Sequence, residues 1–291
     1  MEQGRFSLAL HGGAGAKRSR DYSCEVEHMR GLVEAARDRL ASGAAALDVA
    51  VETVVALEAS GLYVAGRGAS PNTDGIYELD ACLMDGPSRR SGGVAALTGY
   101  ESPIMVARAV MERTPHVLLA GEGARSFAAS AGMARIPSDA ESWFTRAARG
   151  PDQSGALAHG TVGCVVRDGD GRLAAATSTG GTFGKLPGRV GDTPIAGAGA
   201  WADERVAVSS TGQGEFFVRT AAAAQVAHRM RWAGEDIATA TKAVLAEIGA
   251  LGGDGGLIAV DADGNIAVPF NSEGMKRAVL RLDGSITAEV F

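Results

Sequence analysis

The sequence HGTVGCVVRDGDGRLAAATST covers residues 159–179 and decides how the middle of the chain folds. Two apolar runs, Thr161–Arg167 and Arg172–Thr179, flank the segment 168–171, whose sequence Asp-Gly-Asp-Gly is typical of a tight turn between antiparallel strands. Counting outward from the turn pairs residue 161 with about residue 178. We therefore predict a β-hairpin whose open end brings Thr179 close to Thr161.

Patterns on both sides of this hairpin predict groups of strands and groups of helices, with no regular strand–helix–strand repeat. Strands are expected at residues 6–10, 77–84, 93–97, 117–120, 206–210, 257–261, 265–270, 278–282 and 286–291. Helices are expected at residues 23–42, 45–59, 102–113, 122–131, 215–231 and 235–248, with Ser23 and Ser102 as N-caps. Because the strands form hairpins and the helices come in pairs, we expect an α+β sandwich of antiparallel sheets covered by helices.

The composition excludes several classes of protein. The 291 residues include 41 glycines, about twice the usual share, yet 46% are hydrophobic, which is too many for a disordered chain. The net charge is −6 and no run of Lys or Arg exceeds two residues, so we expect no binding to nucleic acid or to an anionic membrane. The apolar run Phe6–Leu10 is too short for a signal peptide, and we expect a cytoplasmic location.

Cys24, Cys82 and Cys164 are odd in number and lie far apart in the sequence. We expect all three to be small buried residues in a reducing compartment, with no role in a disulfide or a metal site.

The sequence contains no complete motif for binding phosphate, a dinucleotide or a metal. The segment 180–186 resembles a phosphate-binding loop, but its glycine spacing is wrong and Leu186 stands where Ser or Thr must reach magnesium. The segment 11–15 lacks the third glycine of a dinucleotide-binding turn, and the five histidines show no metal-ligand spacing.

The chemistry is expected where the weakly patterned stretch 132–160 meets the strand that begins at Thr161. Thr179 lies across the hairpin, and Thr211-Gly212 joins a strand to a helix, where backbone N–H groups can stabilise a developing oxyanion. Taken singly, threonines favour strands and glycine-rich segments favour turns whatever the function.

Six motifs in a fixed order favour a functional site over this general explanation. Through these motifs the sequence resembles the plant-type asparaginases and isoaspartyl peptidases, which are N-terminal nucleophile hydrolases. The motifs are His11–Gly15, Glu78–Ala81 with Met84–Gly86, His159–Gly163, Thr177–Gly181, Leu186–Asp192 and Thr211–Glu215. The resemblance covers nearly the whole chain. It implies a single domain over residues 1–291 with the four-layer αββα sandwich of that family.

The resemblance also implies that the precursor cuts its own Gly160–Thr161 bond, giving an alpha subunit (1–160) and a beta subunit (161–291). A threonine hydroxyl is a poor nucleophile without a base. The freed α-amino group of Thr161, with a reference pKa of about 7.7–8.0, suits that task at neutral pH. Gly160 has no Cβ, so the peptide before the nucleophile can take up the strained geometry of an N-to-O acyl shift.

The remaining roles are carried over by matching motifs. Thr179 orients the Thr161 hydroxyl, while Thr211 and Gly212 form the oxyanion hole. Arg189 binds the substrate α-carboxylate with its planar fork, which Lys cannot reproduce.

The substrate α-ammonium is expected to bind Asp192, with the Gly214 carbonyl as a further acceptor. The substrates implied are L-asparagine and β-aspartyl (isoaspartyl) dipeptides, cleaved through an acyl-enzyme on Thr161.

Catalysis needs no cofactor, but the resemblance implies a structural sodium ion bound by carbonyl oxygens in the loop after the second helix. The matching residues are Leu57, Glu58, Ser60, Tyr63, Ala65 and Arg67. A homodimer of cleaved protomers is also implied. The chain departs from the pattern at Val64, where relatives often carry an Asn that positions water for self-cleavage, and at Gly184 on the pocket rim.

Two alternatives stay open. A glycosylasparaginase-type amidase shares several motifs, although Gly160 and the segment Thr211–Glu215 argue against it. A homologue that binds amino acids without maturing is the other, and Val64 is its support.

Overall fold

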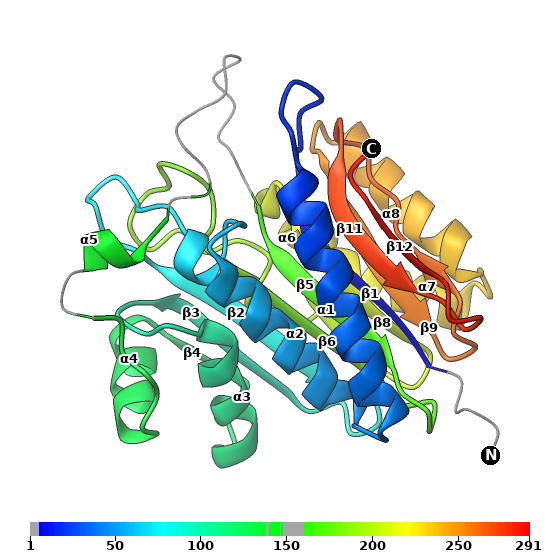
Figure 1. Cartoon of the computed structure of the whole chain (residues 1–291), viewed down its shortest axis with the longest axis horizontal. Helices are drawn as coiled ribbons and strands as arrows, with labels where there is room; N and C mark the ends of the chain where they lie inside the picture. Colours follow the sequence, from blue (N-terminus) through cyan, green and yellow to red (C-terminus); the bar gives the residue numbers. More distant parts are fainter. Residues whose placement is uncertain (1–5, 138–139, 146, 148–159) are drawn as a thin grey trace.

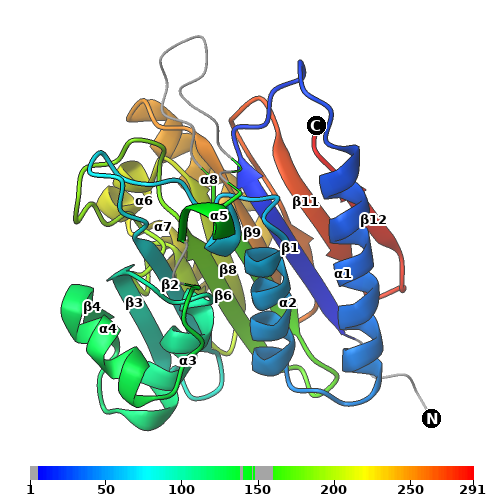
Figure 2. The same cartoon turned by 60° about the vertical axis from the view of Figure 1, so that its left-hand side comes forward.

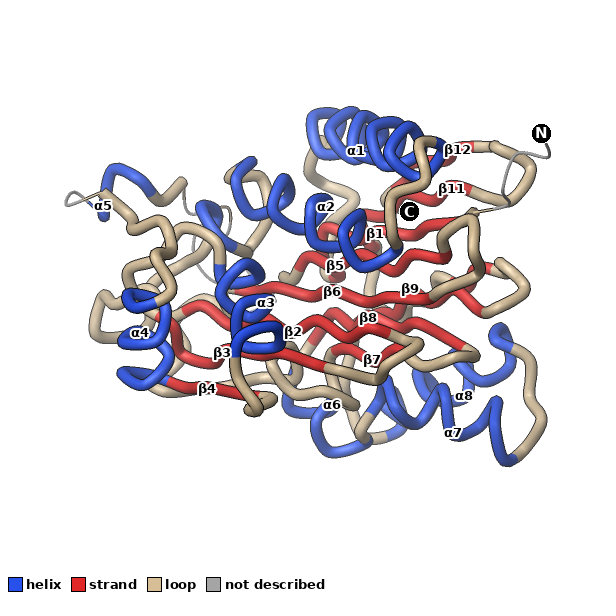
Figure 3. The backbone as a smooth tube through the Cα atoms, turned by 90° about the horizontal axis from the view of Figure 1, so that it is seen from below, coloured by secondary structure: helices blue, strands red, loops and turns tan. Residues whose placement is uncertain are grey.

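The computed structural model describes residues 6–137, 140–145, 147 and 160–291, and within them the chain forms four layers (Figure 1). Seen from below, helices α1, α2 and α3 lie on one side, strands fill the middle, and α6, α7 and α8 lie on the other side (Figure 3). The predicted α+β, four-layer αββα sandwich is therefore confirmed.

The larger sheet has eight strands in the order β12-β11-β1-β5-β6-β2-β3-β4. All neighbours are antiparallel except β3 and β4, which are parallel. The strands are β1 (Ser7–Ala14), β2 (Leu79–Asp85), β3 (Ser91–Leu97), β4 (Leu118–Ala120), β5 (Val162–Arg167), β6 (Leu173–Thr179), β11 (Met275–Leu280) and β12 (Ile286–Glu289). The predicted hairpin forms β5 and β6, which pair with Val162 opposite Ser178.

The smaller sheet has four antiparallel strands in the order β10-β9-β8-β7. These are β7 (Ala200–Ala202), β8 (Val206–Gly212), β9 (Gly255–Asp261) and β10 (Ile266–Ala267).

Helices cover the outer face of each sheet. Figure 2 shows α1, α2 and α3 on one face of the larger sheet. The helices are α1 (Ser23–Ala41), α2 (Ala46–Ser60), α3 (Pro103–Arg113), α4 (Gly121–Ser130), α5 (Ala140–Trp143), α6 (Gly214–Thr220), α7 (Ala222–Trp232) and α8 (Ile237–Ala250), with a 3-10 turn at Gly66–Gly68. In the part of the chain that the structure describes, no helix has both the length and the apolar character needed to cross a bilayer.

The layer between the two sheets changes from apolar to polar along its length, and this change positions the site. Ala9, Val165, Ala175, Ala207 and Ile258 pack together in its apolar part. Side chains alternate between the two faces of a strand, so the residues two and four positions further along face the same interior. Those positions hold His11 on β1, Gly163 and then Thr161 along β5, Thr177 and Thr179 on β6, and Ser209 and Thr211 on β8.

Several sequence-based expectations were wrong in their details. β1 continues through the glycine-rich segment to Ala14, because β11 pairs with it as far as Ala14 opposite Met275, whereas β5 pairs with it only as far as His11. The helix expected at 215–231 is broken at Ala221, whose left-handed backbone (φ 47°) separates α6 from α7. The short strand β7 was not predicted.

The local expectations for two serines and for Cys24 were met only in part. Ser102 is the N-cap residue of α3 as predicted, although its hydroxyl donates to Glu58 and does not cap a helix N–H. Ser23 is the first residue of α1, and Tyr22 is its N-cap. Cys82 and Cys164 are buried as expected, but Cys24 is exposed. Of the irregular stretch 132–160, residues 138–139, 146 and 148–159 lie outside the described residues, including His159 of the predicted motif.

Candidate active site

Thr161 and Thr179 meet at the open end of the β5–β6 hairpin, as the sequence predicted. Both side chains are buried, and the Thr161 hydroxyl donates to Thr179 Oγ1 at 3.2 Å. The Thr179 hydroxyl in turn donates to the Gly160 carbonyl oxygen at 2.7 Å. A third contact fixes Thr179, because the Gly181 N–H donates to its Oγ1 at 2.9 Å. One hydroxyl thus connects the predicted nucleophile with the carbonyl of the predicted scissile bond.

Val64 packs directly against Gly160. A Cβ at Gly160 would lie 2.9 Å from Val64 Cγ2, so only glycine fits beside this valine. The Val64 carbonyl oxygen also accepts a hydrogen bond from the Gly180 N–H at 2.8 Å. The departure from the family pattern at this position therefore places an apolar side chain against the residue before the nucleophile.

Thr211 and Gly212 form the end of β8, on the opposite sheet. Thr211 Oγ1 accepts a hydrogen bond from the Ala14 N–H at 3.1 Å, which ties the end of β8 to the end of β1 across the sandwich. Gly212 has φ +150°, and a Cβ there would lie 2.4 Å from the Asp254 carbonyl oxygen. Glycine is therefore required where β8 passes into α6.

Arg189 and Asp192 lie against the start of α6. The Nε and Nη2 of Arg189 donate to the two Glu215 carboxylate oxygens at 2.8 and 2.9 Å. A Cβ at Gly214 would lie 2.8 Å from Asp192 Oδ1 and 3.1 Å from Arg189 Nη2, so both side chains converge on this glycine.

Asp192 is buried, and its Oδ2 has no hydrogen-bond partner among the described residues. Burial raises the pKa of the Asp192 carboxyl to about 7, although the Arg189 charge acts in the opposite direction. A buried acceptor without a donor is costly in a folded protein, and such an atom at a candidate site is suited to an incoming cationic group.

The chain is similar to known proteins over nearly its whole length. The family model described as asparaginase matches residues 4–149 and 145–289. The chain belongs to the asparaginase family. It is 50% identical over 293 residues to an isoaspartyl peptidase of Salmonella typhimurium, covering 93% of this chain and 94% of that protein. It is 46% identical to the isoaspartyl peptidase of Escherichia coli (94% and 92% covered), and 39% identical to a plant-type L-asparaginase of Pyrobaculum calidifontis (93% and 95% covered).

The candidate site also contains buried charged side chains whose roles the sequence did not reveal. The Lys185 ammonium donates to the Glu78 carbonyl oxygen at 2.7 Å, and a Cβ at Gly181 would lie 3.0 Å from Lys185 Nζ. Burial lowers the Lys185 pKa, and the charges of Asp80 and Glu78 raise it. Asp80 is opposite Thr179 across β2 and β6, and burial raises its pKa to about 6. Glu78 and Asp80 were part of a recognised motif, but sequence alone gave them no partner.

His11 is a second residue whose place the sequence motif did not explain. It is fully buried, and its ring lies between the Thr161 carbonyl oxygen and the Ser209 hydroxyl. Burial lowers the pKa of His11 to about 3, so the ring is neutral at physiological pH. The sequence feature that could have indicated a buried position is that His11 directly follows the apolar run Phe6–Leu10.

The six residues predicted to hold sodium lie at the end of α2 and in the loop that follows. A Cβ at Gly66 would lie 2.7 Å from the Glu58 carbonyl oxygen, and one at Gly68 would lie 1.8 Å from that of Tyr63. Two of the carbonyl oxygens therefore lie directly against glycines, where a side chain would not fit. Oxygen atoms are the ligands that a hard cation prefers.

Several of these carbonyl oxygens already accept hydrogen bonds. The Leu57 oxygen accepts from the Ser60 hydroxyl, the Tyr63 oxygen from the Ala65 N–H, the Ala65 oxygen from the Gly68 N–H and the Arg67 oxygen from the Thr145 N–H. The Glu58 carboxylate accepts from the Ser102 hydroxyl and the Ile104 N–H, and burial raises its pKa to about 7. Among the described residues, no cluster of three His, Cys, Asp or Glu side chains could hold a metal.

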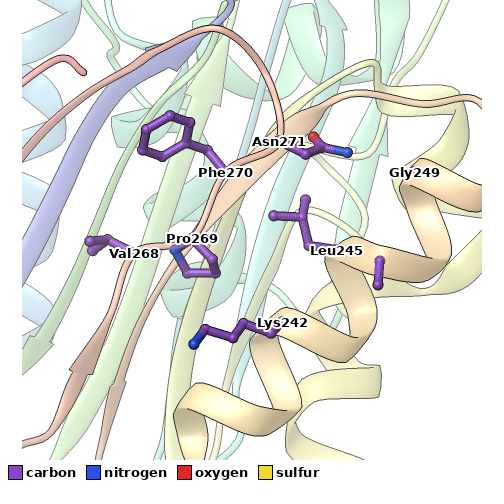
Figure 4. Close-up of a pocket in the computed structure, with 8 residues that line it drawn as sticks. Lys242, Leu245, Gly249, Val268, Pro269, Phe270 and Asn271 are labelled. Atoms are coloured by element: carbon purple, nitrogen blue, oxygen red, sulfur yellow. The ribbon is translucent and has the colours of Figure 1, made fainter.

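A separate surface pocket lies between α8 and the segment 268–271 (Figure 4). It shares no residue with the predicted site. Its lining residues are Lys242, Leu245, Ala246, Gly249, Val268, Pro269, Phe270 and Asn271.

Proposed function

We propose that this chain is a self-processing amidohydrolase that converts L-asparagine to L-aspartate and ammonia and cleaves β-aspartyl (isoaspartyl) dipeptides. Membership of the asparaginase family and the names of the similar proteins support this activity. The observation that carries the proposal is the hydrogen-bond chain from the Thr161 hydroxyl through Thr179 to the Gly160 carbonyl.

The first reaction is cleavage of the chain's own Gly160–Thr161 bond. The Thr161 oxygen attacks the Gly160 carbonyl carbon, the C–N bond breaks, and the hydroxyl proton ends on the departing nitrogen. The Thr179 hydroxyl already donates to the Gly160 oxygen, so it is placed to stabilise the negative charge that develops there. Water then hydrolyses the resulting ester, which frees the Thr161 hydroxyl and α-amino group together.

The second reaction is hydrolysis of the substrate amide. The α-amino group of Thr161 accepts the hydroxyl proton, and Thr161 Oγ1 attacks the substrate's side-chain carbonyl carbon. The proton passes to the leaving nitrogen, so ammonia or the second amino acid departs and leaves an aspartyl ester on Thr161. Thr211 and Gly212 stabilise the oxyanion of both tetrahedral intermediates. Water then releases aspartate.

The substrate's amino-acid end is held by opposite charges from one loop. The Asp192 carboxylate binds the α-ammonium, with the Gly214 carbonyl beside it. Glu215 occupies the Nε–Nη2 edge of the Arg189 guanidinium, so the Nη1–Nη2 edge is left for the substrate α-carboxylate. The planar fork of Arg permits this double use, whereas a Lys ammonium does not.

A sodium ion held by the carbonyl oxygens of residues 57–67 fits this proposal as a structural brace for the loop that carries Val64. A homodimer of cleaved protomers and a cytoplasmic location stay predictions from the sequence.

Intact-mass analysis combined with kinetics tests the proposed function. Wild-type protein is expected as two pieces, residues 1–160 and 161–291, with release of ammonia from asparagine and of the second residue from a β-aspartyl dipeptide. Thr161→Ala is expected to stay as one chain and to be inactive. A single uncut, inactive wild-type chain after long incubation would instead support a non-maturing amino-acid-binding protein. Preference for a glycosylated asparagine over both substrates would support a glycosylasparaginase.

A further inference from the structure

His11 is one of a group of buried polar side chains between the two sheets. The strand registers place His11 opposite Gly163, Gly163 opposite Thr177, and Thr177 opposite Cys82. Ser209 of the smaller sheet faces these residues, with its hydroxyl 2.9 Å from His11 Nε2 and 2.8 Å from Thr177 Oγ1. On its other side, His11 Nδ1 lies 3.1 Å from the Thr161 carbonyl oxygen.

The Thr161 carbonyl oxygen fixes the direction of the hydrogen bonds in this group. A carbonyl oxygen can only accept, so Nδ1 carries the ring proton and donates to Thr161. Nε2 of the neutral ring must then accept, so the Ser209 hydroxyl donates to it, and the Thr177 hydroxyl donates to Ser209. Three donors in series therefore point toward the main chain of Thr161.

Gly163 makes this arrangement possible. A Cβ at this position would lie 2.1 Å from Ser209 Oγ and 2.5 Å from His11 Nε2. No side chain fits there without displacing the histidine ring or the serine. The glycine two residues after the nucleophile is thus explained by the space that the ring and the hydroxyl occupy.

His11 lies where the pairing between β1 and β5 ends. The register between β1 and β5 ends at His11 opposite Gly163, and Thr161 lies two residues beyond that pair. There the imidazole donates to the Thr161 carbonyl oxygen from outside the ladder. Cleavage of the Gly160–Thr161 bond would remove the covalent support on the amino side of Thr161, so the contacts of its carbonyl side become more important.

We propose that His11, held by Ser209 and Thr177, is a positioning residue that fixes the Thr161 main chain and thereby the direction of its hydroxyl and amino groups. This inference rests on the proposed function. It assigns His11 no contact with substrate and no proton transfer.

A pair of substitutions with different reach tests this role. The side-chain amide of His11→Asn can place its nitrogen where Nδ1 lies and donate to Thr161, whereas the longer His11→Gln places its amide near the Nε2 position. We expect His11→Gln to lower kcat per mole of cleaved chain by about 10- to 100-fold with KM unchanged, since small misplacements of a reacting group have effects of that size. We expect His11→Asn to recover most of that loss, although it also lacks the bond to Ser209.

Self-cleavage followed by intact mass provides a second readout, in which the Gln variant is expected to mature more slowly than the Asn variant. If both variants match wild type in kcat and maturation, or if their losses only follow their Tm, His11 is a structural core residue and the proposal is wrong. Wild type is measured beside them, so an uncut, inactive wild-type chain refutes the proposed function itself.

Variants elsewhere in the group cover the case in which His11 substitutions do not fold. Thr177→Val is expected to lower kcat and leave KM unchanged. The matched control is Thr241→Val, which removes an equally buried hydroxyl in α8 and is expected to leave kcat unchanged. Equal effects of these two substitutions would contradict the proposal.

Nitrogen-15 spectra of histidine-labelled wild-type protein, assigned by the missing signal in His11→Asn, report which ring nitrogen is protonated. Protonation at Nδ1 is expected, and protonation at Nε2 would overturn the assignment.

Discussion

At the scale of single residues, Asp192 must be charged for its proposed task although its surroundings favour the neutral form. Its pKa is raised to about 7 because the carboxyl is buried. Binding of a substrate ammonium needs the carboxylate, so kcat/KM is expected to fall as pH drops below about 7. The free Thr161 amine, with a reference pKa of about 7.7–8.0, acts in the same direction.

Asp192→Asn should separate binding from stability. In the folded state this carboxyl keeps its proton up to about pH 7, but in the unfolded chain it loses it near pH 4. The stability that Asp192 contributes is therefore fully present below pH 4 and is lost as pH rises through 7. Asn does not ionise, so the Tm of the variant relative to wild type is expected to rise between pH 4 and pH 7 and then level off.

The same variant is expected to lose most of its kcat/KM at pH 8. Thermal melts and kinetics over this pH range check both statements. A Tm difference that does not change with pH would show that Asp192 is already ionised in the folded protein.

Arg189→Lys and Glu215→Gln test the two edges of the guanidinium. The Lys variant loses one charge-assisted hydrogen bond to the substrate carboxylate, worth about 1.5–3 kcal/mol, which corresponds to a rise in KM of about 10- to 100-fold. Glu215 is more than half exposed, so its loss of charge is expected to cost less than about 1 kcal/mol, or under about fivefold in KM. Steady-state kinetics on asparagine measure both changes in KM. A larger rise in KM from Glu215→Gln than from Arg189→Lys would contradict the assignment of the Nη1–Nη2 edge to the substrate carboxylate.

The sequence predicted the contact between Thr161 and Thr179 because the turn between their strands fixes the register. It could not predict that Lys185 and Asp80 are buried together near Gly181, or that His11 reaches Ser209. The first contact joins a loop residue to strand β2, and the second joins strands of the two sheets. In both, the partners are far apart in the chain, and local patterns carry no information about which side chains meet in the folded protein.

At the scale of secondary-structure elements, the turn of the β5–β6 hairpin also caps a helix. Asp168 Oδ2 accepts a hydrogen bond from the Ala46 N–H at the start of α2, and Asp168 Oδ1 accepts from the N–H groups of Asp170 and Arg172. The N-cap residue of α2 is Ala45, which has no polar side chain, so the cap comes from 122 residues away. A carboxylate at a helix N-terminus is favourable both as an acceptor and as a charge.

Asp168→Ala is expected to lower the free energy of unfolding by about 2–3 kcal/mol, because it removes a helix cap and the bonds that close the turn. Asp168→Asn is expected to cost about 1 kcal/mol, since the amide oxygen still accepts but the charge is lost. Urea titrations measure both. Asp170→Ala, in the same turn but exposed, is the control and is expected to stay within about 0.5 kcal/mol of wild type. An equal loss from the control would mean that the turn, and not the cap, matters.

Most elements could be predicted from periodicity, and the exceptions have physical causes. The segment after His11 was expected to leave the sheet because it is rich in glycine, but its pairing with β11, with Ala14 opposite Met275, keeps it in the sheet. Ala221 interrupts an alanine-rich helix with a left-handed backbone conformation that alanine rarely adopts. The neighbouring sequence has no glycine or proline that would predict this break.

At the scale of the whole molecule, the proposed cut separates two pieces whose strands alternate within one sheet. Residues 1–160 supply β1 to β4, and residues 161–291 supply β5, β6, β11 and β12. In the order β12-β11-β1-β5-β6-β2-β3-β4, strands of the two pieces adjoin at β11–β1, β1–β5 and β6–β2. The cut therefore falls directly before β5, while the hydrogen bonds of the sheet stay intact.

We therefore expect cleaved protein to elute as one species in native size-exclusion chromatography and to separate into two pieces only in denaturant. Separation would break three pairs of antiparallel strands and expose apolar side chains of the cores on both faces of the sheet. Burial of such side chains provides a large part of the stability of a folded protein, so the two pieces are expected to stay together. The uncut Thr161→Ala chain is the matched control and should elute at the same volume. Elution of the two wild-type pieces at different volumes without denaturant would contradict this arrangement, because strands that alternate in one sheet cannot part without unfolding it.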